Sequence, residues 1–89
     1  MYQLELTSQA QRQLYKPSVA DLRRIVATIQ QLRNNPRPSG AKKLRGPIYR
    51  IRVGNWRIVY AVFERDNLIV VGKIARRSKD TYKRMRELL

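Results

Sequence analysis

The sequence predicts an α+β fold in which an N-terminal strand and a helical hairpin pack on an antiparallel sheet, in the order β-α-α-β-β-β-α. Residues up to 33 carry apolar positions at helical spacing, whereas residues 48–75 carry short apolar runs separated by turn residues. The 89 residues contain no repeat, low-complexity tract or linker. We therefore expect residues 1–89 to form a single domain.

The first 16 or so residues predict a strand followed by a short helix. Residues 2–6 alternate between apolar and polar side chains, as a half-buried strand does. Thr7 or Ser8 can then cap a helix that turns Ala10 and Leu14 inward.

A longer helix is predicted over residues 19–33. Ser18 and Asp21 stand at the spacing of a capping box, with Asp in place of the usual Glu. The apolar residues expected on its buried face are Val19, Leu22, Ile25, Val26, Ile29 and Leu32. The two helices would form a hairpin across the Pro17-Ser18 junction.

The second half of the chain predicts an antiparallel meander. Residues 34–40 are rich in Asn, Pro and Gly and are expected to form a loop. Three segments with strand character follow: 48–53, 56–63 and 68–75. Gly54-Asn55 and residues 65–67 supply the two turns between them. Residues 79–89 are expected to form a short basic C-terminal helix or tail.

The charge balance indicates a polyanionic partner. Lys and Arg number 20 against 6 Asp and Glu, for a net charge of +14, and such a charge attracts nucleic acid or an acidic protein. The chain has no cysteine and no histidine, which excludes disulfides, thiolate metal sites and the commonest general base. We therefore expect no metal site and no cofactor.

Two further expectations concern location. No apolar run approaches the length of about 20 residues that a membrane span requires, and the N-terminus lacks the apolar stretch of a signal peptide. These features predict a cytoplasmic protein without a membrane partner.

Basic residues at strand spacing predict the binding surface. Arg50 and Arg52 should project from one side of their strand, while Tyr49, Ile51 and Val53 project from the other. A sheet that presents cations on one side is suited to holding a polyanion. An ordinary solvated strand face is the alternative interpretation.

The next strand leaves its basic residue open to two interpretations. Trp56 shares a face with Ile58 and is expected in the core rather than as a stacking platform. Arg57 can belong to the cationic surface or can pair with Glu64 or Asp66.

The chain resembles the RelE/ParE superfamily of toxin–antitoxin toxins over essentially its whole length. The motifs that carry the resemblance are Lys43-Leu44-Arg45-Gly46, Tyr49-Arg50-Ile51-Arg52-Val53, Trp56-Arg57-Ile58-Val59-Tyr60, and Arg76-Arg77 shortly before Tyr82. The resemblance implies the RelE/ParE-like fold, which is similar to that of microbial ribonucleases. RelE-like members cut mRNA on the ribosome, whereas ParE-like members poison DNA gyrase, and both are silenced by an antitoxin.

The resemblance also implies site residues. Matching the RelE pattern residue by residue gives the catalytic set Arg50, Arg52, Arg57, Arg77 and Tyr82. The residues expected to bind RNA beside it are Lys43, Arg45, Arg76 and Lys79. RelE itself has lysines where this chain has Arg50 and Arg52, so the chain departs from its relative at these two positions.

This departure affects the predicted chemistry. Metal-free cleavage needs a base for the 2′-OH, stabilisation of the phosphorane charge and an acid for the leaving oxygen. Arginine binds phosphate well, but its guanidinium stays protonated in water and cannot act as a base. Tyr82 is the remaining candidate for proton transfer and could instead stack on a base. Lys73 and Lys79 are spare candidates with no positional argument.

Three functions are therefore weighed. The favoured one is a ribosome-dependent mRNA endoribonuclease toxin that inhibits translation, with the ribosome and mRNA as partners. The alternatives are a ParE-like gyrase inhibitor and a non-catalytic RNA-binding module, although the predicted sheet aromatics fall mostly on the apolar side, which disfavours the last. An acidic, RelB-like antitoxin is expected to cover and neutralise the basic surface in a hetero-oligomer.

Overall fold

A computed structural model describes residues 1–76 of the chain. Within them it contains the elements β1 (Gln3–Leu6), α1 (Ser8–Gln13), α2 (Val19–Leu32), β2 (Lys42–Arg45), β3 (Ile48–Val53), β4 (Trp56–Phe63) and β5 (Leu68–Arg76). The predicted α+β class is confirmed. The helix expected over residues 79–89 lies outside the described residues.

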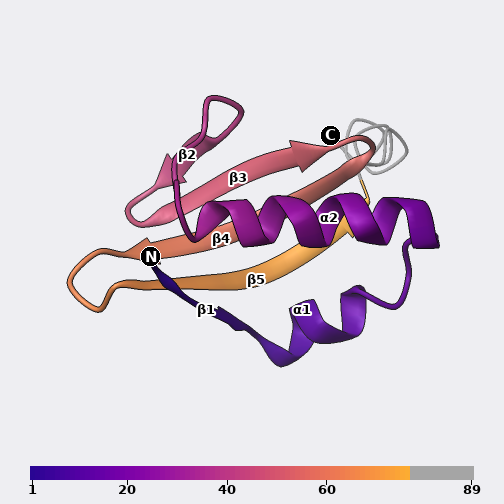
Figure 1. The fold of residues 1–89 in the computed structure, drawn as a ribbon, viewed down its shortest axis with the longest axis horizontal. Helices are drawn as coiled ribbons and strands as arrows, with labels where there is room; N and C mark the ends of the chain where they lie inside the picture. The colour runs from indigo at the N-terminus through magenta and orange to yellow at the C-terminus, as the bar shows by residue number, and fades with distance from the viewer. Residues whose placement is uncertain (77–89) are drawn as a thin grey trace, which may run out of the picture.

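The five strands form one mixed sheet in the order β1-β5-β4-β3-β2 (Figure 1). The predicted antiparallel meander of β3, β4 and β5 is confirmed, and β1 pairs in parallel with β5 at the other side. Within residues 1–76 no helix is long and apolar enough to cross a bilayer.

Strand β2 is absent from the predicted order. Its four residues are all exposed, so they show no alternation of buried and exposed side chains. Three of them are Lys or Arg, which single-residue preference does not favour in strands. The strand forms because its backbone pairs with β3, across a register shift between Lys43 and Arg45. The pairing is a local hairpin closed between Arg45 and Ile48, but the residues of β2 lack the apolar alternation that would have indicated a strand.

Both helices begin at the predicted caps. The Thr7 hydroxyl accepts a hydrogen bond from the Ala10 backbone N–H at 3.1 Å, and the Ser18 hydroxyl accepts one from the Asp21 backbone N–H at 3.2 Å. α1 packs against β5 and β1, and α2 lies over the sheet roughly along the direction of its strands (Figure 1).

The predicted buried face of α2 is wrong at two positions. Ile25, Ile29 and Leu32 are buried as expected, but Val26 is 40% exposed and Val19 is 68% exposed. Consecutive helical residues lie about 100° apart, so Val26 falls at the margin of a stripe centred on Ile25 and Ile29. Val19 is the first residue of the helix.

One hydrophobic core lies between the helices and one face of the sheet. Strand β4 illustrates it, because buried and less buried residues alternate along its length. Trp56, Ile58 and Tyr60 all face the core, which confirms the prediction for Trp56. The side chains between them project from the opposite face, which is called the outer face below. Neither of the two helices of residues 1–76 contributes its buried side chains there.

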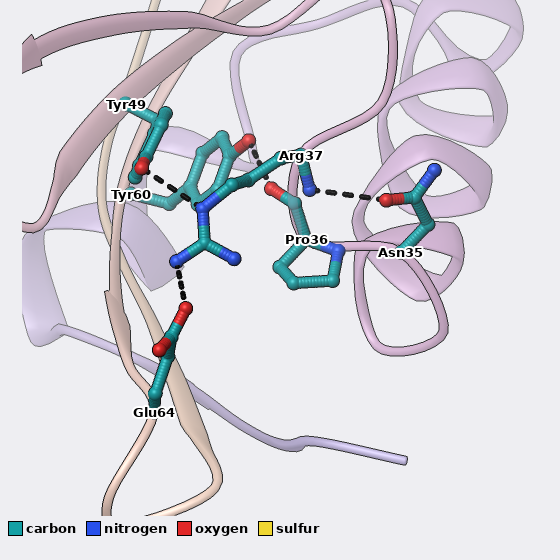
Figure 2. Close-up of polar contacts among 6 residues, drawn as sticks. All are labelled: Asn35, Pro36, Arg37, Tyr49, Tyr60 and Glu64. Atoms are coloured by element: carbon teal, nitrogen blue, oxygen red, sulfur yellow. Dashed lines mark hydrogen bonds and ion pairs between the residues drawn. The ribbon is translucent and has the colours of Figure 1, made fainter.

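The loop after α2 is attached to the sheet by a polar network (Figure 2). The Tyr60 hydroxyl donates to the carbonyl of Pro36 at 2.7 Å, and the Tyr49 ring stacks on Tyr60 with centroids 5.9 Å apart. Arg37 donates from Nε to the Tyr49 hydroxyl at 2.9 Å and forms an ion pair with Glu64. The network fixes the loop over the core.

Tyr60→Phe is expected to lower the free energy of unfolding by about 1–3 kcal/mol. The variant keeps the ring but leaves the carbonyl of Pro36 without its donor, and an unsatisfied buried acceptor has about that cost. Urea denaturation measures the loss. Tyr49→Phe, which removes a hydrogen bond to an exposed guanidinium, serves as the control and is expected to cost less.

The stability difference between the wild type and Tyr60→Phe is expected to depend on pH. Burial raises the pKa of Tyr60 to about 12, above the value of about 10 for an unfolded tyrosine. The folded state then binds more protons than the unfolded state between these two values, so stability falls as pH rises through this window. The difference in stability between the wild type and Tyr60→Phe should therefore shrink from about pH 10 upwards, and a constant difference would contradict the assignment.

Candidate functional site

The outer face begins with two arginines of β3. Ile51 and Val53 are buried, at 8% and 9% exposure, so the residues that alternate with them, Arg50 and Arg52, project from the other side. Tyr49 packs against the core cluster on the same side as Ile51. The predicted partition of this strand is confirmed.

Strand pairing brings a third arginine to them. Arg52 lies directly opposite Arg57 of β4, and Arg50 lies opposite Val59. Directly opposed residues of an antiparallel pair share a face, with Cβ atoms about 4.5–5.5 Å apart. Two guanidinium groups in that relation present positive charge on one side of the sheet, which suits the binding of an anion.

Arg50 and Arg57 each keep a hydrogen-bond donor available for a ligand. The Nε atoms of Arg50 and Arg57 are buried and have no hydrogen-bond partner within residues 1–76. The predicted alternative, in which Arg57 pairs with Glu64 or Asp66, does not occur within residues 1–76. Glu64 follows the far end of β4 and pairs with Arg37 instead.

The turn beside the arginines is held by α2. Gly54 has a φ of 58° at the first turn position between β3 and β4, which favours glycine. A Cβ there would come within 3.2 Å of Nη1 of Arg24. The Trp56 indole N–H donates to the Asp21 carboxylate at 3.1 Å. Figure 1 shows the first turn of α2 beside this end of the hairpin.

Two lysines that the sequence analysis left out of the site also lie on the outer face. Lys42 of β2 is opposite Arg50, and Lys73 of β5 is opposite Val59. Five of the outer-face cations form a group called the cation cluster below: Lys42, Arg50, Arg52, Arg57 and Lys73. Recognising β2 as a strand would have revealed Lys42, and reading Gly72 as a possible bulge would have revealed Lys73.

The structure places two of the other predicted residues apart from the cation cluster. Lys43 is opposite Tyr49, and Arg76 is opposite Trp56, so both register with core-facing positions. Arg45 is opposite Ile48, which lies on the outer face two residues from Arg50, so Arg45 borders the cation cluster about 7 Å along the strand. The remaining predicted residues, Arg77, Lys79 and Tyr82, lie outside the described residues and stay predictions.

The surface of the sheet is less basic away from the cation cluster. A shallow hollow of about 190 Å³ is lined by Ile48, Val59, Tyr60, Ala61, Phe63, Val70 and Gly72. A second hollow of about 420 Å³ lies at the sheet end distant from the Gly54 turn, where Lys43 and Arg65 stand beside Glu64 and Asp66. Its mixed charge suits a polyanion less well than the cation cluster does.

Known proteins resemble this chain in sequence and in fold. A family model described as "ParE toxin of type II toxin-antitoxin system, parDE" matches residues 4–81. RelE1 of Methanocaldococcus jannaschii is 30% identical over 81 residues, which span 85% of this chain and 90% of that protein.

Two solved structures share the fold. The archaeal RelE–RelB complex from Pyrococcus horikoshii contains a chain that superposes with a TM-score of 0.81 and 27% identity, covering 88% of this chain and 97% of that one. The isolated RelE toxin of E. coli superposes with a TM-score of 0.77 and 19% identity over the full length of both chains.

Proposed function

Since the chain belongs to the ParE toxin family of type II toxin–antitoxin systems, within the RelE/ParE superfamily, we propose that it inhibits translation by cutting mRNA on the ribosome. The reaction is an attack of a ribose 2′-OH on the adjacent phosphate, which yields a 2′,3′-cyclic phosphate and a free 5′-OH. This proposal chooses the RelE-like activity over the gyrase inhibition of ParE-like members.

The observation that carries the proposal is the cation cluster. Arg52 and Arg57 are directly opposed, and Arg50 lies beside them on the same face. Guanidinium groups can each bind two phosphate oxygens and keep their charge at any physiological pH. Three of them on one rigid sheet are suited to the extra negative charge of a phosphorane. A protein that only binds gyrase has no need for this convergence.

The described arginines do not supply the proton transfers. A guanidinium holds its protons too firmly to act as a base or an acid near neutral pH. By resemblance, Arg77 adds a further phosphate contact and Tyr82 stacks on a base or moves a proton. The ribosome would place the mRNA in line for the attack, which reduces what the protein must do by itself.

The proposed partner for the silent state is an acidic antitoxin. The relative from Pyrococcus horikoshii was solved as a RelE–RelB complex, and a net charge of +14 would otherwise attract RNA of any sequence. An acidic segment laid over the cation cluster would neutralise it and deny mRNA access to the same side chains.

The proposal is tested by incubating the purified protein with a reporter mRNA, with and without programmed ribosomes, and mapping new 5′ ends. Cuts that appear only with ribosomes are expected. The double variant Arg52→Gln/Arg57→Gln should not cut, and Arg12→Gln/Arg23→Gln, which removes two helix charges, is the matched control.

Two other outcomes would each overturn the proposal. Inhibition of gyrase supercoiling by a protein that leaves the mRNA intact would establish the ParE-like activity. Binding of RNA without cutting or gyrase inhibition would indicate an RNA-binding module.

A further inference from the structure

Strand β5 contains a bulge in the middle of the outer face. Val59 pairs with Lys73 and Tyr60 pairs with Val71, so Gly72 is an extra residue that β4 does not match. In an unbroken strand, buried Val71 would place Lys73 in the core as well. The bulge reverses this phase, because Lys73 is exposed and Ile74 is buried instead.

Helix α1 holds the bulge in place. The Thr7 hydroxyl donates to the carbonyl of Gly72 at 3.1 Å, and the backbone N–H of Ile74 donates to Oε1 of Gln13 at 2.6 Å. Strand β1 pairs with β5 only as far as Val71, so α1 and its cap supply the partners for these backbone groups of β5 beyond that point. Because α1 satisfies them, the orientation of Lys73 is fixed by two elements rather than by β5 alone.

The bulge places the primary amine of Lys73 on the same face of the sheet as the arginines. Lys73 lies opposite Val59, whose neighbour two residues earlier on the same face is Arg57. Diagonal partners of this kind are about 7–8 Å apart, within reach of long side chains. Arg50 lies on the other side of Val59. Bulges beside binding sites commonly re-aim one side chain in this way.

We propose that Lys73 is the general acid of the mRNA cleavage described above, an inference that rests on the proposed function. The 2′-oxygen forms a bond to phosphorus and loses its proton to solvent. As the bond from phosphorus to the 5′-oxygen breaks, the Lys73 ammonium transfers one proton to that oxygen. The resulting amine regains a proton from water. Arginine cannot take this role, whereas a lysine ammonium can.

The test compares two substrates and two variants on programmed ribosomes under single-turnover conditions. One mRNA has the normal phosphodiester, and the other has sulfur in place of the 5′-oxygen at the cleaved position. A thiolate leaves without being protonated, so this substrate does not require an acid. Lys73→Arg keeps the positive charge and removes the transferable proton. Lys73→Met removes both, and Lys43→Arg is the control from the other face.

Lys73→Arg is expected to cut the normal mRNA about 10²–10⁴-fold more slowly than the wild type and to cut the sulfur-containing mRNA at the wild-type rate. Lys73→Met should recover partly with sulfur, because it also loses a phosphate contact. Circular dichroism should show native folding, since Lys73 is exposed.

Two results would overturn the assignment. If Lys73→Arg cuts the normal mRNA at the wild-type rate, Lys73 supplies only charge. If it is equally slow on both substrates, Lys73 acts in some step other than protonation. Failure of the proposed function is distinct from both, because the wild type itself would then leave the normal mRNA uncut, and Lys73 would have no cleavage to assist.

Discussion

Replacing Arg57 with alanine is expected to slow mRNA cleavage on the ribosome by about two to three orders of magnitude. Removal of one preorganised donor to a developing oxyanion has an effect of that size. Arg57 stands opposite Arg52, and its Nε is buried with no hydrogen-bond partner in the described part of the chain. It therefore has a donor committed to no other group within residues 1–76.

The fold should tolerate this change. Arg57 projects from the outer face, and its removal relieves the repulsion with Arg52, so the free energy of unfolding should stay the same or rise. Single-turnover cleavage and urea denaturation measure the two effects separately.

Lys43→Ala is the matched control for Arg57→Ala, since it also removes one cation but from a core-side register position. It should retain cleavage. If Lys43→Ala loses as much activity as Arg57→Ala, total charge rather than the cation cluster controls the reaction. If Arg57→Ala keeps full activity, the site has been placed on the wrong face.

Binding of single-stranded RNA is expected to weaken about 100-fold between about 50 and about 200 mM salt. The five residues of the cation cluster would displace counterions from about five phosphates, which gives a logarithmic slope of about −3.5 for a single strand. Fluorescence anisotropy with a labelled oligonucleotide measures this slope in the absence of ribosomes.

The double variant Arg52→Gln/Arg57→Gln tests which cations are responsible. It removes two of the five contacts, so the slope should become shallower by about 1.4. An unchanged slope would mean that RNA contacts other basic residues of the chain. The double variant Arg12→Gln/Arg23→Gln again serves as the control and should keep the slope of the wild type.

The local sequence pattern was sufficient to predict most of the fold. The caps at Thr7 and Ser18, the meander and the outward direction of Arg50 and Arg52 all follow from spacing and turn residues, and the structure has them. The exposure of Val19 could not be inferred in this way. How much of a helix contacts the sheet depends on tertiary packing and not on the periodicity of the helix itself.

The candidate site was predictable only in part. Lys42 reaches it because β2 pairs with β3, and Lys73 reaches it because α1 stabilises a bulge 61 residues further along the chain. The strand that carries Lys42 has no apolar alternation, and the contact that fixes the bulge joins distant segments, so local periodicity indicates neither. The family resemblance led to the expectation that Lys43 lies beside the arginines. Strand alternation instead directs it to the other face of the sheet.

The cation cluster also makes the protein's thermal stability a property of its surroundings. Any polyanion that binds the cation cluster of the folded chain better than the unfolded chain raises the melting temperature by mass action. The isolated chain in dilute buffer is then its least stable form. Antitoxin, RNA or a simple sulfated polymer would each act as a folding aid during purification.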